Sequence, residues 1–247
     1  YRLEKSLISA AQIAELPKRL EPGDILLERR EWYVSNVGLP GYWPHAALYI
    51  GSQEERARYF DTAEVRDWVK RQGETSGNFE QLLQRRHAKA HEEGNRPQHG
   101  HPARVIEAIS EGVSLTTIEH SADADALAVL RPRLGRVDKA MAILRAYGYI
   151  GRPYDFNFDF RSDTTLVCSE LVYKVYEPIA GMTGMRFPII KVLGRLTSGP
   201  NDFAEQFDRQ FGTPEQQSDL VLFLDGNELG KQAVEATLDE FRRSWKR

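Results

Sequence analysis

The sequence predicts an α+β fold, in which helices pack against strands that come from separate parts of the chain. Two segments, residues 45–50 and 103–110, are short runs of strand-forming residues. A third, residues 168–177, has apolar side chains at helical spacing and ends before Pro178. At 247 residues, of which 41% are hydrophobic, the chain is long enough for one globular core with additional segments. We therefore expect a single domain over residues 1–247.

Two elements are expected before the first of these strands. Residues 9–20 have the apolar spacing of a short amphipathic helix, which ends before Pro22 and Gly23. Residues 25–29 follow as the first strand of the sheet.

The strand at residues 45–50 begins with a histidine. Side chains alternate between the two faces of a strand, so His45 shares a face with Ala47 and Tyr49. The opposite face carries Ala46, Leu48 and Ile50. Because alanine is small, we expect room beside the imidazole for a second side chain.

Residues 52–102 separate the two strands and are expected to form a helical insertion. Asp61 and Thr62 can cap a helix over residues 63–71, and Asn78 can cap another that runs to about Glu93. Because the insertion joins two strands that carry candidate functional groups, we expect it to lie beside the functional site and to shape it.

Four histidines lie in this insertion, and His87 and His91 are one helical turn apart, as in many zinc sites. The segment lacks the glutamate of a metalloprotease motif. In addition, Arg85, Arg86 and Lys89 would repel a cation. We therefore expect a solvated polar helix and no metal site here.

The strand at residues 103–110 is apolar except for Glu107. A carboxylate in such a strand needs a partner. If the two strands are neighbours, Glu107 can accept a hydrogen bond from His45 and so fix the imidazole tautomer. The structural alternatives are a satisfied core histidine and an ion pair of Glu107 with Arg104 or Arg58.

The later elements alternate between strands and helices. In order, we expect a strand at residues 127–131, a helix at 137–149, a helix at 203–211 capped by Asn201-Asp202, a strand at 220–224 and a charged helix at 228–245. The last two make residues 212–247 a C-terminal extension of strand and helix.

The only cysteine, Cys168, opens the helix at residues 168–177. Asp163, Thr164 and Thr165 are upstream residues that can cap this helix. A thiol in the first turn faces unpaired backbone N–H groups and the positive end of the helix dipole, which stabilise a thiolate. The alternative is a small buried hydrophobic residue.

Five short segments together resemble one family of enzymes. They are residues 22–27, 45–51, 105–108, 151–155 and 167–172. They resemble the circularly permuted papain-like hydrolases of the YiiX/YaeF type, which are relatives of the NlpC-type cell-wall peptidases. In the unpermuted members the nucleophile helix precedes the histidine strand, whereas here histidine comes first, then glutamate, then cysteine.

The resemblance implies a papain-like fold, with a small antiparallel sheet or half-barrel packed against the helix that begins at Cys168. It implies Cys168 as the nucleophile, His45 as general base and acid, and Glu107 as the residue that orients the histidine. The backbone N–H of Cys168 and the phenol of Tyr154 are the implied donors to the oxyanion. The alternative for Tyr154 is a packed loop aromatic. No cofactor is implied.

The implied reaction is hydrolysis of an amide or related acyl bond through a thioacyl-enzyme. Tyr42 and Trp43 could line a cleft for a peptide stem or an acyl chain, although aromatics beside prolines are commonly structural. The lecithin:retinol acyltransferase group resembles the same permuted arrangement, so a lipid acyltransferase or phospholipase is the first alternative. A non-catalytic binding module is the second.

Composition excludes several classes of partner. The net charge of −3 gives no general attraction to nucleic acid. The chain has no apolar stretch of the ~20 residues needed to span a bilayer, and its mean hydropathy is −0.51. The sequence begins at Tyr1, which is consistent with a removed signal peptide or with trimming. The family resemblance favours the bacterial cell envelope.

Overall fold

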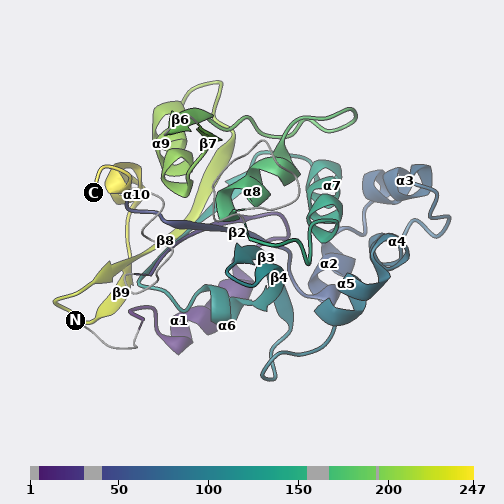
Figure 1. The fold of residues 1–247 in the computed structure, drawn as a ribbon, viewed down its shortest axis with the longest axis horizontal. Helices are drawn as coiled ribbons and strands as arrows, with labels where there is room; N and C mark the ends of the chain where they lie inside the picture. The colour runs from purple at the N-terminus through teal and green to yellow at the C-terminus, as the bar shows by residue number, and fades with distance from the viewer. Residues whose placement is uncertain (1–5, 31–40, 155–166, 193–194) are drawn as a thin grey trace.

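The computed structural model describes residues 6–30, 41–154, 167–192 and 195–247 (Figure 1). Its centre is a seven-stranded, entirely antiparallel sheet with the strand order β4-β3-β2-β1-β5-β8-β9. The strands are β1 (Ile25–Arg29), β2 (His45–Tyr49), β3 (Ala103–Ile109), β4 (Gly112–Thr117), β5 (Ala126–Pro132), β8 (Ser218–Asn227) and β9 (Gln232–Glu235). A small separate pair consists of β6 (Ile190–Val192) and β7 (Arg195–Thr197).

Helices cover both faces of the sheet, and four more lie at one end of it (Figure 1). On one face lie α7 (Arg136–Tyr147), α8 (Cys168–Tyr176) and α9 (Pro200–Gln210), with α10 (Leu238–Ser244) beside α9; on the other lie α1 (Ala10–Glu15), continued by a short 3-10 turn, and α6 (Ile118–Ser121). The four at the end are α2 (Gln53–Tyr59), α3 (Ala63–Arg71), α4 (Phe79–Arg86) and α5 (Ala88–Gly94). This arrangement confirms the predicted α+β class.

The alternation predicted for β2 is confirmed by its two buried faces. Ala46 and Leu48 belong to the large hydrophobic core under α7 and α8. Ala47 and Tyr49 belong to a second core, which α1 and α6 cover. The His45 face of the sheet is therefore the face toward α1 and α6, while α8 packs against β2 from the other face.

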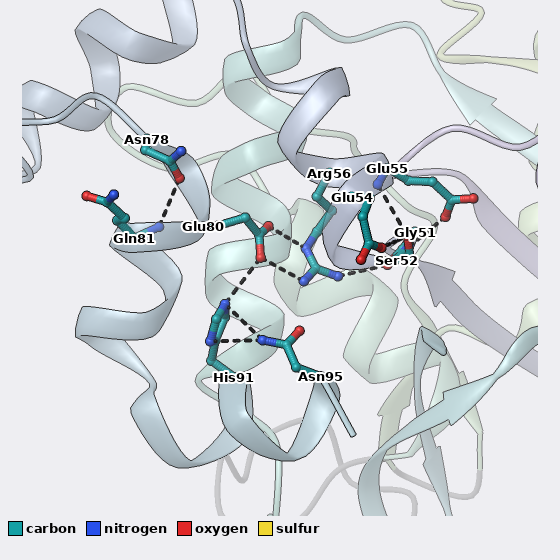
Figure 2. Close-up of polar contacts among 10 residues, drawn as sticks. All are labelled: Gly51, Ser52, Glu54, Glu55, Arg56, Asn78, Glu80, Gln81, His91 and Asn95. Atoms are coloured by element: carbon teal, nitrogen blue, oxygen red, sulfur yellow. Dashed lines mark hydrogen bonds and ion pairs between the residues drawn. The ribbon is translucent and has the colours of Figure 1, made fainter. Parts of the chain in front are cut away.

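The expected insertion contains α2 to α5, and a buried polar network fixes it to the end of β2 (Figure 2). Arg56, with only 2% of its surface exposed, donates from Nη1 to the Gly51 carbonyl at 2.8 Å. Its Nε and Nη2 donate to the two carboxylate oxygens of Glu80 at 2.7 and 2.9 Å. His91 Nε2 lies 3.2 Å from Glu80. Whether residues 52–102 are an insertion in the evolutionary sense stays a prediction.

The single helix expected from residue 79 to residue 93 is wrong. The chain forms two helices that meet at His87, whose φ of −139° and ψ of 52° are not helical. The break lets α5 turn back along α4, which places His91 against Glu80. Neither glycine nor proline marks this break, so the local sequence gave no signal for it.

The helix expected at residues 228–245 is also wrong over its first half. Asn227 Oδ1 accepts a hydrogen bond from the Gly230 N–H at 2.8 Å, and this turn leads from β8 into β9. The helix α10 begins only after Thr237, which forms a capping box with Glu240.

The cap predicted for the helix at residues 203–211 is wrong as well. The helix α9 begins at Pro200 after the N-cap Gly199, so Asn201 is inside the helix and is not its cap.

The helix α8 begins at Cys168 as predicted, but its N-cap is Val167, whose N–H lies 3.4 Å from the Glu170 carboxylate. The expected capping residues Asp163, Thr164 and Thr165 lie outside the described residues. None of the helices in the described ranges is both long and apolar enough to cross a membrane.

Candidate active site

The strands β1, β2 and β3 bring three ionisable side chains to one face of the sheet. Glu28 on β1 stands opposite His45 on β2 in the ladder. Glu107 on the next strand, β3, has a fully buried carboxylate, and its Oε2 lies 2.7 Å from His45 Nε2. Thr116 Oγ1 donates to the other oxygen, Glu107 Oε1, at 2.6 Å. Glu107 thus has the partner that the sequence predicts, and neither Arg104 nor Arg58 takes its place.

Cys168 reaches the same histidine from the other side. It is the first residue of α8, it is 1% exposed, and its Sγ lies 3.9 Å from the Pro44 carbonyl oxygen, immediately before His45. Its side chain interacts with His45 through charge and through a hydrogen bond. The imidazole, 17% exposed, therefore lies between a carboxylate and a thiol.

The electrostatics of this group favour a charged imidazole. Burial disfavours the charged form, but attraction to the Cys168 thiolate and the hydrogen bonds to Cys168 and Glu107 outweigh it and raise the pKa of His45 well above its usual value. Burial would raise the pKa of Glu107, but the hydrogen bond from His45 and its charge lower that pKa to about 2. The site thus favours a protonated His45 beside an ionised Glu107, which is the state of the histidine that supports a thiol nucleophile.

A second carboxylate, Glu28, completes this group and was not predicted from the sequence. Glu28 is fully buried, and the donor atoms of Glu28, His45 and Glu107 all lie within 4.8 Å of one another. The signal was present, because Glu28 follows Ile25, Leu26 and Leu27 and so interrupts an apolar strand in the same way as Glu107.

One imidazole and two carboxylates form a ligand set that transition metals can bind. Within the described ranges, this is the one place where three such ligand atoms lie close together. However, the Arg30 guanidinium lies 3.3 Å from Glu28 and already supplies a cation there. We therefore interpret the group as an ion-pair network. Among the residues that the structure describes, His87 and His91 do not belong to any such group.

Tyr42 and Trp43, expected to line a cleft, are buried beside the candidate site. The Trp43 side chain is 0% exposed, and its Nε1 donates to Ser244 Oγ at 2.8 Å. The Tyr42 hydroxyl donates to Asp225 at 2.6 Å. Asn201 Oδ1 accepts hydrogen bonds from the backbone N–H groups of both aromatic residues, at 3.1 and 3.3 Å. The structure favours the structural alternative, in which they anchor the loop that leads to the histidine.

Tyr154 is half-buried and packs against the large core. The loop before it is fixed to the start of β4, because Val113 donates to the Arg152 carbonyl and Gly151 donates to the Val113 carbonyl, both at 2.8 Å. Gly112 faces the same loop, and a Cβ there would lie 2.5 Å from the Arg152 carbonyl oxygen. The role of Tyr154 as an oxyanion donor stays a prediction.

Residues 19–223 match the family model described as permuted papain-like amidase enzyme, YaeF/YiiX. The chain belongs to this family. The match includes His45, Glu107 and Cys168 and confirms the family that the five sequence segments predict. A permuted papain-like amidase therefore accounts for the order of histidine, glutamate and cysteine along this chain.

No curated protein matches the sequence of this family member. Among solved structures it is similar to the crystal structure of the metalloprotein YiiX from Escherichia coli. The two are 18% identical, with 89% of this chain and 97% of that chain covered and a TM-score of 0.44.

Proposed function

We propose that this chain is a cysteine amidase in which Cys168 attacks the carbonyl carbon of an amide. The observation that carries the proposal is the position of His45, with Glu107 on one side and Cys168 on the other. The three side chains come from three elements that are distant in sequence, β2, β3 and α8. A core histidine would need one partner, whereas this one has a hydrogen-bonding carboxylate and a thiol.

The proposed reaction has two steps. The thiolate attacks the carbonyl carbon, and the imidazolium donates its proton to the amine as the C–N bond breaks, which leaves a thioester on Cys168. Neutral His45 then takes a proton from water, whose oxygen attacks the thioester. The carboxylic acid leaves and the thiolate and imidazolium are restored. Glu107, ionised throughout, holds the ring in position.

The oxyanion of each tetrahedral intermediate needs hydrogen-bond donors. Cys168 is the first residue of α8, so its backbone N–H is one of those that have no partner within the helix. Tyr154 is the second proposed donor, on the strength of the family resemblance and of its anchored loop.

Tyr154→Phe is expected to lower kcat by about 10²-fold with little change in KM, because an oxyanion donor acts mainly in the transition state. Steady-state kinetics on an amide substrate measure this. Tyr149→Phe, in the neighbouring turn, is the matched control and should leave kcat unchanged. Equal kcat values for wild type and Tyr154→Phe would assign the second donor to another group.

His45→Ala is expected to lower kcat by about 10³ to 10⁴-fold, since it removes the acid and base of both steps. Glu107→Gln should cost less, about 10²-fold, because the amide oxygen still accepts the hydrogen bond but the charge that stabilises the imidazolium is lost. Parallel kinetics on the two variants test the assignment. A fully active Glu107→Gln enzyme would show that another residue orients the histidine.

The substrate class is proposed to be a peptide or related amide, which is what an amidase family indicates. A panel of peptide amides, cell-wall stem peptides and phospholipid esters tests it. Turnover of at least one amide supports the proposal. Hydrolysis or acyl transfer with lipid esters alone would favour the lipid acyltransferase instead, and binding without turnover of any compound would favour the binding module.

A further inference from the structure

Glu28 lies beside the histidine of the proposed mechanism but takes no part in the steps described above. It is opposite His45 in the ladder between β1 and β2, and its carboxylate is fully buried. One of its carboxylate oxygens lies within 4.8 Å of a ring nitrogen of His45 and of a carboxylate oxygen of Glu107. Two fully buried carboxylates thus face one imidazole.

The helix α6 holds Glu28 in place. The Ser121 hydroxyl donates a hydrogen bond to Glu28 Oε1. Arg30 Nη2 lies 3.3 Å from Glu28 Oε2 and also donates to the backbone carbonyls of His120 and Ser121, each at 2.8 Å. Glu28 and Arg30 are therefore fixed by the same end of α6, and the carboxylate cannot turn away from the sheet without leaving its donors.

The charges that face Glu28 come from every element around it. They are Arg30, the residue that follows β1, His45 on β2 and Glu107 on β3, while the His120 side chain on α6 is exposed. Burial raises the pKa of Glu28, and the charges of Arg30 and His45 and the hydrogen bond from Ser121 oppose this shift. With Glu28 and Glu107 ionised, the Arg30 guanidinium and the His45 imidazolium balance their charges, and loss of the imidazolium proton would leave a net charge of −1 in a buried site, which is unfavourable at low dielectric.

We propose that Glu28 is a positioning residue that acts with Glu107 to keep the positive charge on His45. This inference rests on the proposed function, since it assigns to Glu28 the maintenance of the imidazolium that donates a proton to the leaving group. Glu107 sets the orientation of the ring through its hydrogen bond. Glu28 adds a second negative charge, which extends the charged state of the ring to higher pH.

The sign of the effect can be tested directly. A negative charge close to an imidazole favours its protonated form, so neutralising Glu28 should lower the pKa of His45 by about one unit or more. The alkaline limb of the pH profile of kcat/KM should move down with it. If Glu28 had only a structural role, its replacement would lower stability or kcat. It would leave the pKa of His45 and the alkaline limb of the pH profile unchanged.

The experiment is an NMR titration of the full chain labelled with ¹³C-histidine, in which His45→Ala assigns the His45 signal. Wild type, Glu28→Gln and the matched control Glu80→Gln are compared. Glu80 is another buried glutamate beside a histidine, so its replacement should shift the His91 signal and leave His45 unchanged. A pKa of His45 that falls in Glu28→Gln only supports the proposal.

Ser121→Ala keeps the proposal testable if Glu28→Gln does not fold. It removes the hydroxyl that stabilises the ionised form of Glu28, so it should lower the pKa of His45 in the same direction by a smaller amount. An unchanged pKa of His45 in folded Glu28→Gln, or in Ser121→Ala, would overturn the role of Glu28 and leave the proposed triad intact. A wild-type His45 whose titration is unaffected by Cys168→Ala would overturn the proposed triad as well.

Discussion

Replacement of Cys168 with alanine is expected to abolish amide hydrolysis, with a loss of at least about 10⁴-fold in kcat, because the proposed nucleophile is removed. Cys168 is the only cysteine in the chain, so alkylation reports on it alone. We expect iodoacetamide to label the wild type rapidly at about pH 6, where ordinary thiols react slowly, because the neighbouring imidazolium supports the thiolate. Mass spectrometry and the hydrolysis assay measure the two effects.

The His45→Ala variant tests whether the rapid labelling of Cys168 depends on the imidazole. If a thiolate and an imidazolium form a pair, His45→Ala should lose the rapid reaction at low pH, and circular dichroism checks that the variant is folded under the labelling conditions. Equally slow labelling of both proteins would indicate a buried structural thiol. That result would replace the amidase with a binding module on the same fold.

Replacement of Glu80 with alanine is expected to lower the free energy of unfolding by about 3–5 kcal/mol. Figure 2 shows the reason, since both carboxylate oxygens of Glu80 accept hydrogen bonds from Arg56 and one also contacts His91. The guanidinium is 2% exposed and would remain buried without its counter-ion. Urea denaturation, followed by circular dichroism, measures the change.

Two controls separate the buried pair from charge effects in general. Glu92→Ala breaks the exposed ion pair with Arg96 in the same insertion and should change stability by less than about 1 kcal/mol. The double variant Arg56→Met/Glu80→Leu removes both buried charges and should recover most of the loss. A Glu80→Ala protein as stable as wild type would show that Arg56 finds another partner.

The same network has a predictable dependence on pH. Burial alone would raise the pKa of Glu80, but hydrogen bonds from His91 and Arg56 lower it below its usual value. A carboxyl with a lowered pKa in the folded state contributes stability above its unfolded pKa of about 4.3, and this contribution is lost as the pH falls below that value. Wild type should therefore lose more stability than Glu80→Ala between about pH 5 and pH 3.

The parts of the site that the sequence predicts are those with a local signal. His45 follows a proline and opens an alternating strand, Glu107 interrupts an apolar one, and Cys168 begins a helix. Their meeting depends on strand order, which only the family resemblance supplied. Glu28 carries the same local signal as Glu107, but without a known pairing of β1 and β2 nothing linked it to the histidine.

Other features depend on contacts between distant residues, which local patterns do not contain. Trp43 was predicted to line a cleft because it lies next to the proposed site residues in the sequence, whereas its indole donates to Ser244, about 200 positions away in the chain. The break at His87 brings His91 to Glu80 and has no turn residue to mark it. In contrast, the turn at Asn227 and the capping box at Thr237 are local signals that the charged composition of residues 228–245 obscured.

The anchoring of the histidine loop has a consequence for when the site can form during synthesis. The Asn201 side chain accepts hydrogen bonds from the backbone N–H groups of Tyr42 and Trp43 and donates one to the Trp245 carbonyl. The Ser244 hydroxyl accepts a hydrogen bond from the Trp43 indole. A ribosome makes these partners long after β2 and β3. A growing chain can therefore pair its histidine and glutamate strands early but cannot secure the loop until α10 has emerged. Until then the loop that leads to the histidine would lack its anchors.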